Sequence, residues 1–361
     1  MAHTQSVLRD GVVVCACGGK EYKARDAIDA ALFRRELEPS WREFLRSIKA
    51  EKRALEIELE LDHNAIEAAA EFFRYAHDLI TAEETEQWLA DRALTLEDFS
   101  EYFARQYWRD VVDENIAAEH VDLVSAPTEL RQLFTTNLLF SGELDLLNTR
   151  LMWRLAALAA GEQSVVDPKR IAVERQQFID RNKITVSRLS EWLGQIGRDK
   201  QWLEEALALE AAYHRVCETV LNPQARKKQL AMLRMPLTQF EAEVIEVESR
   251  DAAREALLCI REDGMSMEEV AAEARYPYRR LTFLHQDVAG ELQQKFWSVG
   301  AGDMLEPVPR GDGFELYRIT KKTEPELNDA AVQQRIDDCL LEGHFSTLAR
   351  EYVEARLASP V

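Results

Sequence analysis

The residues that most often bind metals or act as nucleophiles are few and scattered in this chain. Cys15 and Cys17 form a Cys-x-Cys pair before Gly18. A structural zinc site needs a second pair of ligands, and the sequence offers none at a matching spacing. Glu210 and His214 share one helix face at a spacing of i, i+4, but no third ligand accompanies them. We therefore predict no metal site and no cofactor, and we interpret both cysteines as small strand residues.

The sequence carries no catalytic motif for hydrolysis or group transfer. It lacks a Gly-x-Ser-x-Gly elbow and a glycine-rich phosphate loop. His63 and His77 are too far apart in the sequence to be neighbours on one helix face. We therefore assign no catalytic residue.

The composition is that of an acidic globular protein. The chain has 361 residues, 46% of them hydrophobic, and a net charge of −20. This length allows roughly two or three domains, and this charge argues against nucleic acid and membranes as partners. No run is long and apolar enough to span a bilayer, and Met1–Asp10 lacks the pattern of a signal peptide. Five scattered cysteines fit reduced thiols, so we predict a cytoplasmic protein.

The elements that must position any site begin with a long helical region. From residue 26 to about residue 118, glycine and proline are almost absent, and Leu, Ala, Glu and Arg dominate. Thr81 and Thr95 each precede an acidic residue by three positions, which is the spacing of a helix N-cap. Aromatic residues recur at helical spacing from Phe99 to Trp108, and we interpret them as helix–helix core.

A second segment repeats part of this pattern. The first segment has Phe73, Thr81 and Trp88-Leu89, and the second has Phe178, Thr185 and Trp192-Leu193. The similarity predicts two copies of one helical-hairpin unit packed together.

Strand-like and helix-like patterns alternate from Phe240 to Lys322. The run QFEAEVIEV favours a strand, and Ser266 with Glu269 is typical of a helix start. We expect a loop over RYPYRRLTF (residues 275–283) and a short amphipathic helix over AGELQQKFWSV. Gly311-Asp312-Gly313 is typical of a hairpin turn between two closing strands, because glycine adopts positive φ without steric cost.

This order of elements resembles a parvulin-type peptidyl-prolyl isomerase domain. The segments GAGDMLEPV (Gly300–Val308) and GFELYRI (Gly313–Ile319) are similar to the turn and the final strand of parvulins. The resemblance covers about a quarter of the chain. The opening GVVVCACGGKEY, followed by a helix, resembles the start of SurA- and PrsA-type chaperones. In those proteins the C-terminal helix returns to complete the N-terminal helical domain, which implies a similar return here.

The polar groups that parvulins place beneath the proline peptide bond are replaced in this chain. The resemblance puts the first histidine on Val244, the acid on Arg279 and the second histidine on Glu315, with Pro277-Tyr278 in place of a glycine pair. Isomerisation must lower a barrier of about 18–20 kcal/mol. Loss of these groups therefore predicts a catalytically degenerate domain, whose apolar peptide-binding groove could survive.

The resemblance also implies where that groove lies. Its methionine position falls on Val288, and its two phenylalanine positions fall on Leu292 and Trp297. The groove candidates are Phe283, Val288, Leu292, Trp297 and Phe314. His285 precedes the short helix, and we interpret it as a solvated loop residue.

Together these patterns predict an α+β fold that is mostly α. It is a helical-hairpin bundle or cradle with an inserted small parvulin-like α/β domain and a C-terminal helix that returns to the helical part. The predicted domains are 1–120, an N-terminal strand pair with a helical domain; 121–235, a second helical segment and linker helix; 236–323, the parvulin-like domain; and 324–361, the C-terminal helix.

The predicted function is a cytoplasmic SurA-like polypeptide-binding chaperone or an accessory protein of peptide maturation. Its partners would be unfolded or precursor peptide and a partner maturation enzyme, with no nucleic acid and no membrane. One alternative is an active peptidyl-prolyl isomerase that uses Glu315 and Tyr278. Another is a helical scaffold for a partner enzyme. An isomerase needs proline in its ligand, whereas a chaperone should accept apolar peptides without it.

Overall fold

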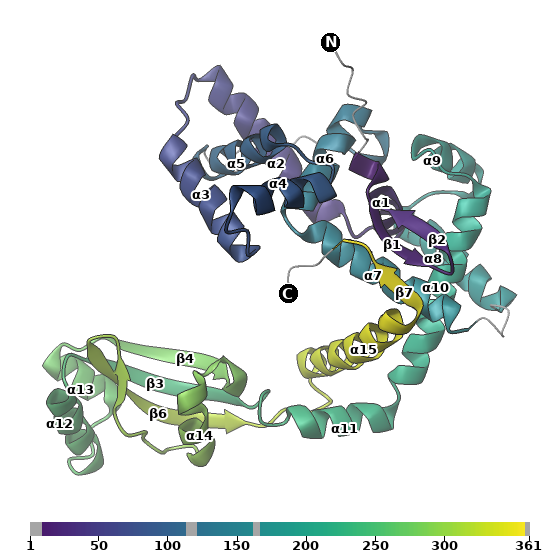
Figure 1. Ribbon diagram of the computed structural model, residues 1–361. Coiled ribbons are helices and arrows are strands. Elements are labelled where there is room, and N and C mark those ends of the chain that lie inside the picture. Colours follow the sequence, from purple (N-terminus) through teal and green to yellow (C-terminus); the bar gives the residue numbers. More distant parts are fainter. Residues whose placement is uncertain (1–8, 113–120, 162–166, 358–361) are drawn as a thin grey trace. The chain divides into compact units, whose positions relative to one another are not determined.

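The protein folds into two compact units (Figure 1). The computed structural model describes residues 9–112, 121–161 and 167–357. Most of the signal-peptide interpretation of Met1–Asp10 concerns residues outside these ranges. Unit 1 comprises Met1–Cys217 and His344–Val361, and unit 2 comprises Glu218–Gly343. Unit 2 is thus inserted into the sequence of unit 1.

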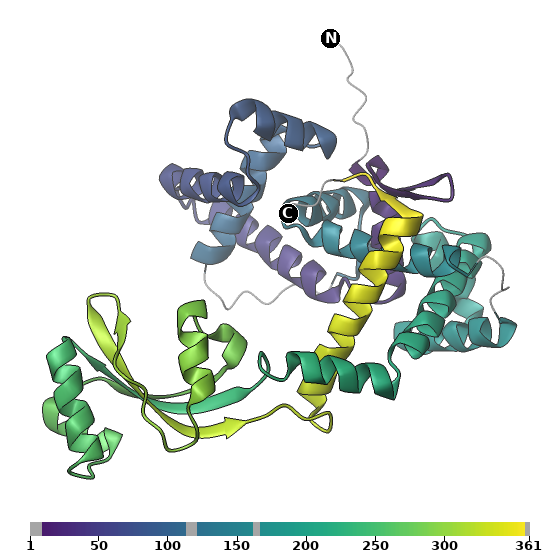
Figure 2. The same cartoon turned by 60° about the horizontal axis from the view of Figure 1, so that its bottom comes forward.

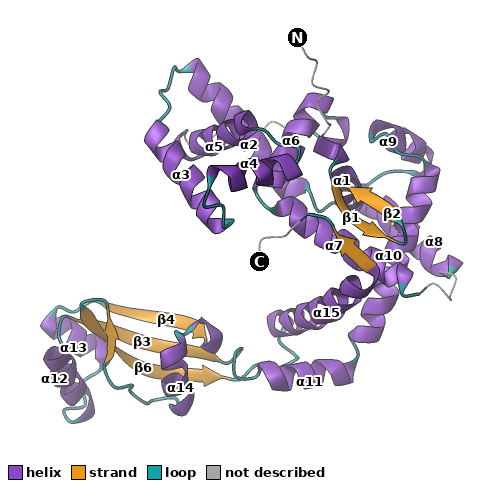
Figure 3. Ribbon diagram, viewed as in Figure 1, coloured by secondary structure: helices purple, strands orange, loops and turns teal. Residues whose placement is uncertain are grey.

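The predicted fold class is confirmed, because helices dominate and two small antiparallel sheets accompany them (Figure 3). Unit 1 contains β1 (Val13–Cys17), β2 (Lys20–Lys23), α1 (Ala24–Phe33), α2 (Glu38–Glu56), α3 (His63–Ala76), α4 (Ala82–Asp91), α5 (Leu96–Val111), α6 (Thr128–Phe140), α7 (Glu143–Ala159), α8 (Pro168–Asn182), α9 (Leu189–Gln195) and β7 (Val353–Ala355). The chain leaves unit 1 within α10 (Lys200–Val220) and returns within α15 (Ala330–Tyr352).

The sheet of unit 1 joins the two ends of the sequence. Its strand order is β2-β1-β7, and Cys15 lies opposite Ala355. The C-terminal segment was predicted to be helical, but only part of it is. The helix ends at Tyr352 and the chain continues as a strand, because β1 offers a free edge to it. Cys15 is fully buried, and burial raises the pKa of its thiol to about 12. A thiol that stays protonated is a poor metal ligand.

The predicted caps order the helices of unit 1. Thr81 accepts a hydrogen bond from the backbone N–H of Glu84 at 3.1 Å, and the Glu84 carboxylate accepts one from the N–H of Thr81 at 2.8 Å. Thr95 forms the same capping box at the start of α5. Each box satisfies N–H groups that have no partner inside the helix. These two helix starts were therefore predicted correctly.

The two similar helical segments share one contact. Phe73 meets Trp88 edge to face at 5.3 Å, and Phe178 meets Trp192 edge to face at 5.2 Å. The prediction that they pack together into one core was wrong. The first pair belongs to the main cluster of unit 1, whereas the second belongs to a separate cluster around Phe33. The aromatic stripe of α5 is core, since its Phe103 is buried in the main cluster.

Unit 2 is built on a four-stranded antiparallel sheet of order β4-β3-β6-β5. Its elements are α11 (Pro223–Leu233), β3 (Gln239–Val247), α12 (Arg250–Arg261), α13 (Met267–Ala274), β4 (Tyr278–Leu284), α14 (Gly290–Ser298), β5 (Val308–Arg310) and β6 (Gly313–Thr323). Helices α12 and α13 cover one face and α14 covers the other (Figure 2). The predicted hairpin turn is confirmed, since Arg310 pairs with Gly313.

One element of unit 2 differs from the prediction. The segment 275–283, expected as a loop, contains most of β4, which pairs with β3 from Tyr278 to Leu284. Its apolar residues Leu281 and Phe283 alternate with polar ones, which is typical of a strand. This alternation is short, and the adjacent arginines and Pro277 favoured a loop instead. The strand forms because β3 offers it a complete edge of backbone hydrogen-bonding groups.

Candidate functional site

The face of the unit 2 sheet that meets α14 carries most of the predicted site residues. Successive side chains of a strand point to opposite faces. The buried floor of this face is formed by Phe240, Ala242, Val244, Phe296, Leu305, Val308, Tyr317 and Ile319. On it lie five apolar side chains that remain partly exposed, which we call the apolar face: Leu281, Phe283, Val288, Leu292 and Val299.

Three of the five groove candidates come together on this surface. Phe283 of β4, Val288 of the connecting loop and Leu292 of α14 all belong to the apolar face. Trp297 adjoins it. Phe314 lies on the opposite face of the sheet, in the cluster beneath α12 and α13. Phe314 and Leu316 alternate with the residues that face α14, so a groove under α14 cannot include Phe314.

Trp297 contacts a cation and a histidine rather than the floor. The Lys322 Nζ lies 4.5 Å from the centre of the indole ring and donates to the Trp297 carbonyl at 2.8 Å. The His285 ring meets the indole edge to face at 5.7 Å. An ammonium above an aromatic face is attracted by the ring quadrupole. This contact holds the end of α14 against β6.

The sequence reasoning missed Phe296, which is the aromatic anchor of α14. Its ring is buried and meets those of Phe283 at 5.4 Å and Tyr317 at 5.2 Å. The signal was the i, i+4 spacing of Leu292 and Phe296, which places both on one helix face. The resemblance to parvulins instead assigned the second aromatic position to Trp297, one residue further along.

The prediction for His285 was wrong. Its side chain is 3% exposed, and a ring nitrogen lies 2.9 Å from the carbonyl oxygen of Gln293. The histidine begins a single 3₁₀ turn that leads from β4 into α14. Burial under Trp297 and a backbone partner make it part of the packing, not a solvated loop residue. Unit 2, all of whose residues the structure describes, has no other histidine.

The three residues that the resemblance assigned to the parvulin polar positions adjoin one another at the other end of this face. Val244 is fully buried and lies opposite Arg279 on β4 and Tyr317 on β6. Arg279 in turn forms ion pairs with Glu246 and Glu315. The structure therefore brings Val244, Arg279 and Glu315 together, but as a hydrophobic residue beside an ion-pair network.

Glu315 is the centre of that network. It is 2% exposed and accepts hydrogen bonds from the Tyr317 hydroxyl at 2.5 Å, from Arg310 at 2.7 Å and from Arg279. It also lies directly opposite Glu246 across the strand pair. Like charges at such positions repel each other, and Arg279 offsets this repulsion by contacting both carboxylates. We call Glu246, Arg279, Arg310, Glu315 and Tyr317 the Glu315 network.

The Tyr317 hydroxyl of the network stays protonated at neutral pH. Burial and the hydrogen bond to Glu315 raise the pKa of Tyr317 to about 12, so its hydroxyl remains a donor at neutral pH. The Glu315 carboxylate already accepts from three side chains. It is therefore poorly placed to act as a general base. A cavity of about 620 Å³ adjoins this end and is lined in part by Glu246, Arg310 and Glu315.

The residues of the predicted isomerase alternative are separated. The Tyr278 hydroxyl donates to Glu243 at 2.9 Å, on the face opposite Glu315. Tyr278 and Glu315 therefore cannot act on the same peptide bond. Among the described residues, no group of three His, Cys, Asp or Glu side chains is placed to hold a metal ion. Over the same ranges, none of the helices combines the length and the apolar character that crossing a bilayer requires.

The comparisons with known proteins found similarity among solved structures, at low identity and low TM-score. No family model and no curated protein sequence matches the chain. Among solved structures, it is similar to the peptidylprolyl isomerase PrsA from Bacillus anthracis, with 12% identity, a TM-score of 0.27, and coverage of 56% of this chain and 93% of that one. PrsA from Bacillus cereus has 13% identity, a TM-score of 0.32 and coverage of 61% and 84%. A SurA-like chaperone from Campylobacter jejuni has 11% identity, a TM-score of 0.20 and coverage of 60% and 88%.

Proposed function

We propose that the protein is a polypeptide-binding chaperone of the SurA and PrsA type, whose parvulin-like unit binds extended peptide without isomerising it. The observation that carries this proposal is the apolar face. Five partly exposed apolar side chains pack against one buried floor that contains three aromatic rings. Contiguous exposed apolar surface on a soluble protein is typical of a binding site.

The energetics favour a modest, sequence-tolerant affinity. Burial of a leucine- or phenylalanine-sized side chain contributes about 1.5–3 kcal/mol. Phe283, Val288 and Leu292 can receive one or two such side chains of a client. Strand β4 is also one of the two edge strands of this sheet, so an extended peptide could add its backbone hydrogen bonds there. Backbone pairing is independent of sequence, which suits unfolded or precursor peptide as client.

The Glu315 network supports the loss of isomerase activity. Its carboxylate and its phenol are hydrogen-bonded to each other, and the histidine of unit 2 is buried next to Trp297. A preorganised site must stabilise the twisted peptide bond better than the planar one. In this network the polar groups partner one another. One observation favours the second candidate, an active isomerase, namely the 620 Å³ cavity beside Arg310 and Glu315.

NMR exchange spectroscopy tests the proposal. Apolar peptides with and without proline are mixed with substoichiometric protein. Line broadening of both peptides, without cis–trans exchange cross-peaks, is the expected result. Leu292→Glu places a charge in the apolar face and should weaken binding at least about tenfold, equivalent to about 1.4 kcal/mol.

The matched control is Leu258→Glu. Leu258 is 53% exposed on α12, which covers the other face of the sheet, so this variant should bind like the wild type. Exchange cross-peaks with the proline peptide would establish the isomerase instead. Equal binding by the Leu292 variant and the wild type would show that the apolar face is not the peptide site.

A further inference from the structure

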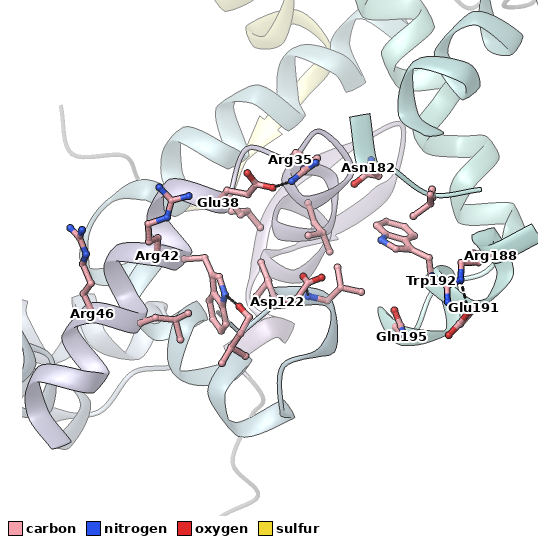
Figure 4. A pocket seen from close by; sticks show the side chains of 18 residues that line it. Arg35, Glu38, Arg42, Arg46, Asp122, Asn182, Arg188, Glu191, Trp192 and Gln195 are labelled. Carbon is pink, nitrogen blue, oxygen red and sulfur yellow. Dashed lines mark hydrogen bonds and ion pairs between the residues drawn. The ribbon is translucent and has the colours of Figure 1, made fainter. Parts of the chain in front are cut away.

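Unit 1 contains a cavity of about 830 Å³ that the sequence did not reveal (Figure 4). Its walls come from the end of α1, from α2, from residues 121–124 and from residues 182–195 at the end of α8 and in α9. Half of its lining residues are apolar and most of the others are charged. Ligand sites commonly have this volume.

Two buried tryptophans form rigid parts of the wall. Trp41 is 6% exposed, donates from Nε1 to the Val121 carbonyl at 2.7 Å, and packs against Phe134 at 5.0 Å. Trp192 is 7% exposed and packs against Phe178. Its indole nitrogen faces the open space in Figure 4. Because each ring is fixed by an aromatic neighbour, the cavity is formed before any ligand arrives.

The rim of the cavity is basic along α2. Arg42 and Arg46 are exposed and lie on successive turns of the helix, at one end of the lining in Figure 4. Arg46 pairs with Glu43 at 2.9 Å, and Arg35 pairs with Glu38. Within residues 9–112, 121–161 and 167–357, Arg42 has no carboxylate partner.

The shape of the cavity suits a chain segment. The row Glu38, Arg42 and Arg46 follows α2 for about 12 Å, at about 1.5 Å per residue. An extended peptide of about four residues spans the same length. Its apolar side chains would face the two tryptophans, and its acidic side chains would reach the arginines.

We propose that this cavity binds an extended polypeptide segment in which a large apolar residue is followed by acidic residues. Arg42 and Arg46 recognise the carboxylates, and the wall between Trp41 and Trp192 receives the apolar side chain. The pairing of a basic rim with an acidic ligand supplies the specificity. The proposal does not rest on the apolar face of unit 2, since the two sites share no residue.

Fluorescence anisotropy with a labelled, capped octapeptide tests the proposal on the full chain. The peptide carries leucine and phenylalanine followed by two glutamates. Two matched peptides carry glutamines or lysines in place of the glutamates. We expect the glutamate peptide to bind at least about tenfold more tightly than either, and we expect this preference to shrink as salt screens the charges. Arg42→Glu should weaken binding of the glutamate peptide about tenfold, while leaving the glutamine peptide unchanged.

Two controls locate the site. Arg53→Glu reverses an exposed arginine on the same helix that does not line the cavity, and it should bind as the wild type does. Leu292→Glu in unit 2 should also leave the glutamate peptide unaffected, which separates this inference from the proposed function. A photo-crosslinking benzoyl group in place of the phenyl ring should label residues 41–46 or 182–195.

Three results would overturn the inference. The first is equal affinity for the glutamate and glutamine peptides, which removes the role of the rim. The second is crosslinking confined to unit 2, which moves the site elsewhere. The third is the absence of binding by all three peptides, which leaves the cavity to some other class of ligand.

Discussion

Glu315 is the residue to which the resemblance assigns the second parvulin histidine, and its surroundings explain why a carboxylate can be buried there. Two guanidinium groups and a phenol contact it. The substitution itself could be read from the sequence through the resemblance. Its partners could not, because Arg310 approaches across the hairpin turn and Arg279 from a strand 36 residues away.

Removal of the Glu315 side chain should destabilise unit 2. Glu315→Ala removes the acceptor of the buried Tyr317 hydroxyl and leaves Arg279 with Glu246 as its remaining carboxylate partner. We expect this to lower the free energy of unfolding by about 2 kcal/mol. Arg310 is 64% exposed and can return to water at little cost. Glu315→Gln keeps one acceptor and should lose about half as much. Urea unfolding measures the difference.

The matched control for this prediction is an exposed glutamate outside the network. Glu262 at the end of α12 is exposed, so Glu262→Ala should change the free energy of unfolding by less than about 0.5 kcal/mol. If Glu315→Ala unfolds at the same urea concentration as the wild type, the network is only a surface feature.

His285 shows a limit of prediction at the residue scale. Gln286 and Asp287 follow it in the sequence, and this polar stretch favoured an exposed loop. The burial arises from Trp297 and from the Gln293 carbonyl, which both belong to the helix that follows, α14. Packing between elements determines whether such a side chain is buried, and the local sequence pattern does not show this packing.

Helix starts were the most predictable elements, because a cap depends only on residues within one turn. Ser266 accepts from the backbone N–H of Glu269 at 3.2 Å, and the Glu269 carboxylate accepts from the N–H of Ser266 at 2.8 Å. Strand β4 was the least predictable element, because its pairing partner β3 begins 39 residues earlier. The groove candidates shared this weakness: Phe314 was assigned correctly to a strand but to the wrong side of it.

Loss of the cap should weaken α13 measurably. Ser266→Ala removes the acceptor at the start of the helix and should lower the free energy of unfolding by about 1 kcal/mol. Thermal unfolding by circular dichroism records the change.

Ser298→Ala is a suitable control, because Ser298 donates to the Lys295 carbonyl at the end of α14 and caps no helix start. Equal melting temperatures for the two variants would contradict the role assigned to Ser266.

The whole molecule buries several groups that must stay protonated. Burial raises the pKa of the Cys15 thiol from 9.0 to about 12, and it raises those of Tyr22 and Tyr213 from 10.0 to about 12, as it does for Tyr317. In the unfolded chain these groups release protons near their ordinary values. Between about pH 9 and pH 12 the folded state therefore binds more protons than the unfolded state.

Stability should consequently be retained up to about pH 9 and fall as the pH rises towards 12. Urea unfolding at pH 8, 9.5 and 11 measures this decline. Cys15→Ala removes the group that titrates first and should reduce the loss between pH 8 and 9.5. A free energy of unfolding that stays constant up to pH 11 would show that these groups are not held protonated by the fold.

The return of the chain to unit 1 was predictable only through the resemblance, which implied that the C-terminal helix goes back to the helical domain. Residues from His344 onward do belong to unit 1. The strand that follows the helix, Val353–Ala355, is too short for any pattern to reveal. It exists because β1 provides the pairing groups.

The pairing of Cys15 with Ala355 also determines when the sheet of unit 1 can be completed during synthesis. The ribosome adds about 5–20 residues per second, so β1 waits roughly 20–70 s for its partner strand to be translated. During that interval all of Glu218–Gly343 is synthesised, while the sheet of unit 1 still has an open edge. A chain released before Val353 is added should therefore contain a folded unit 2, while the sheet of unit 1 still lacks its third strand.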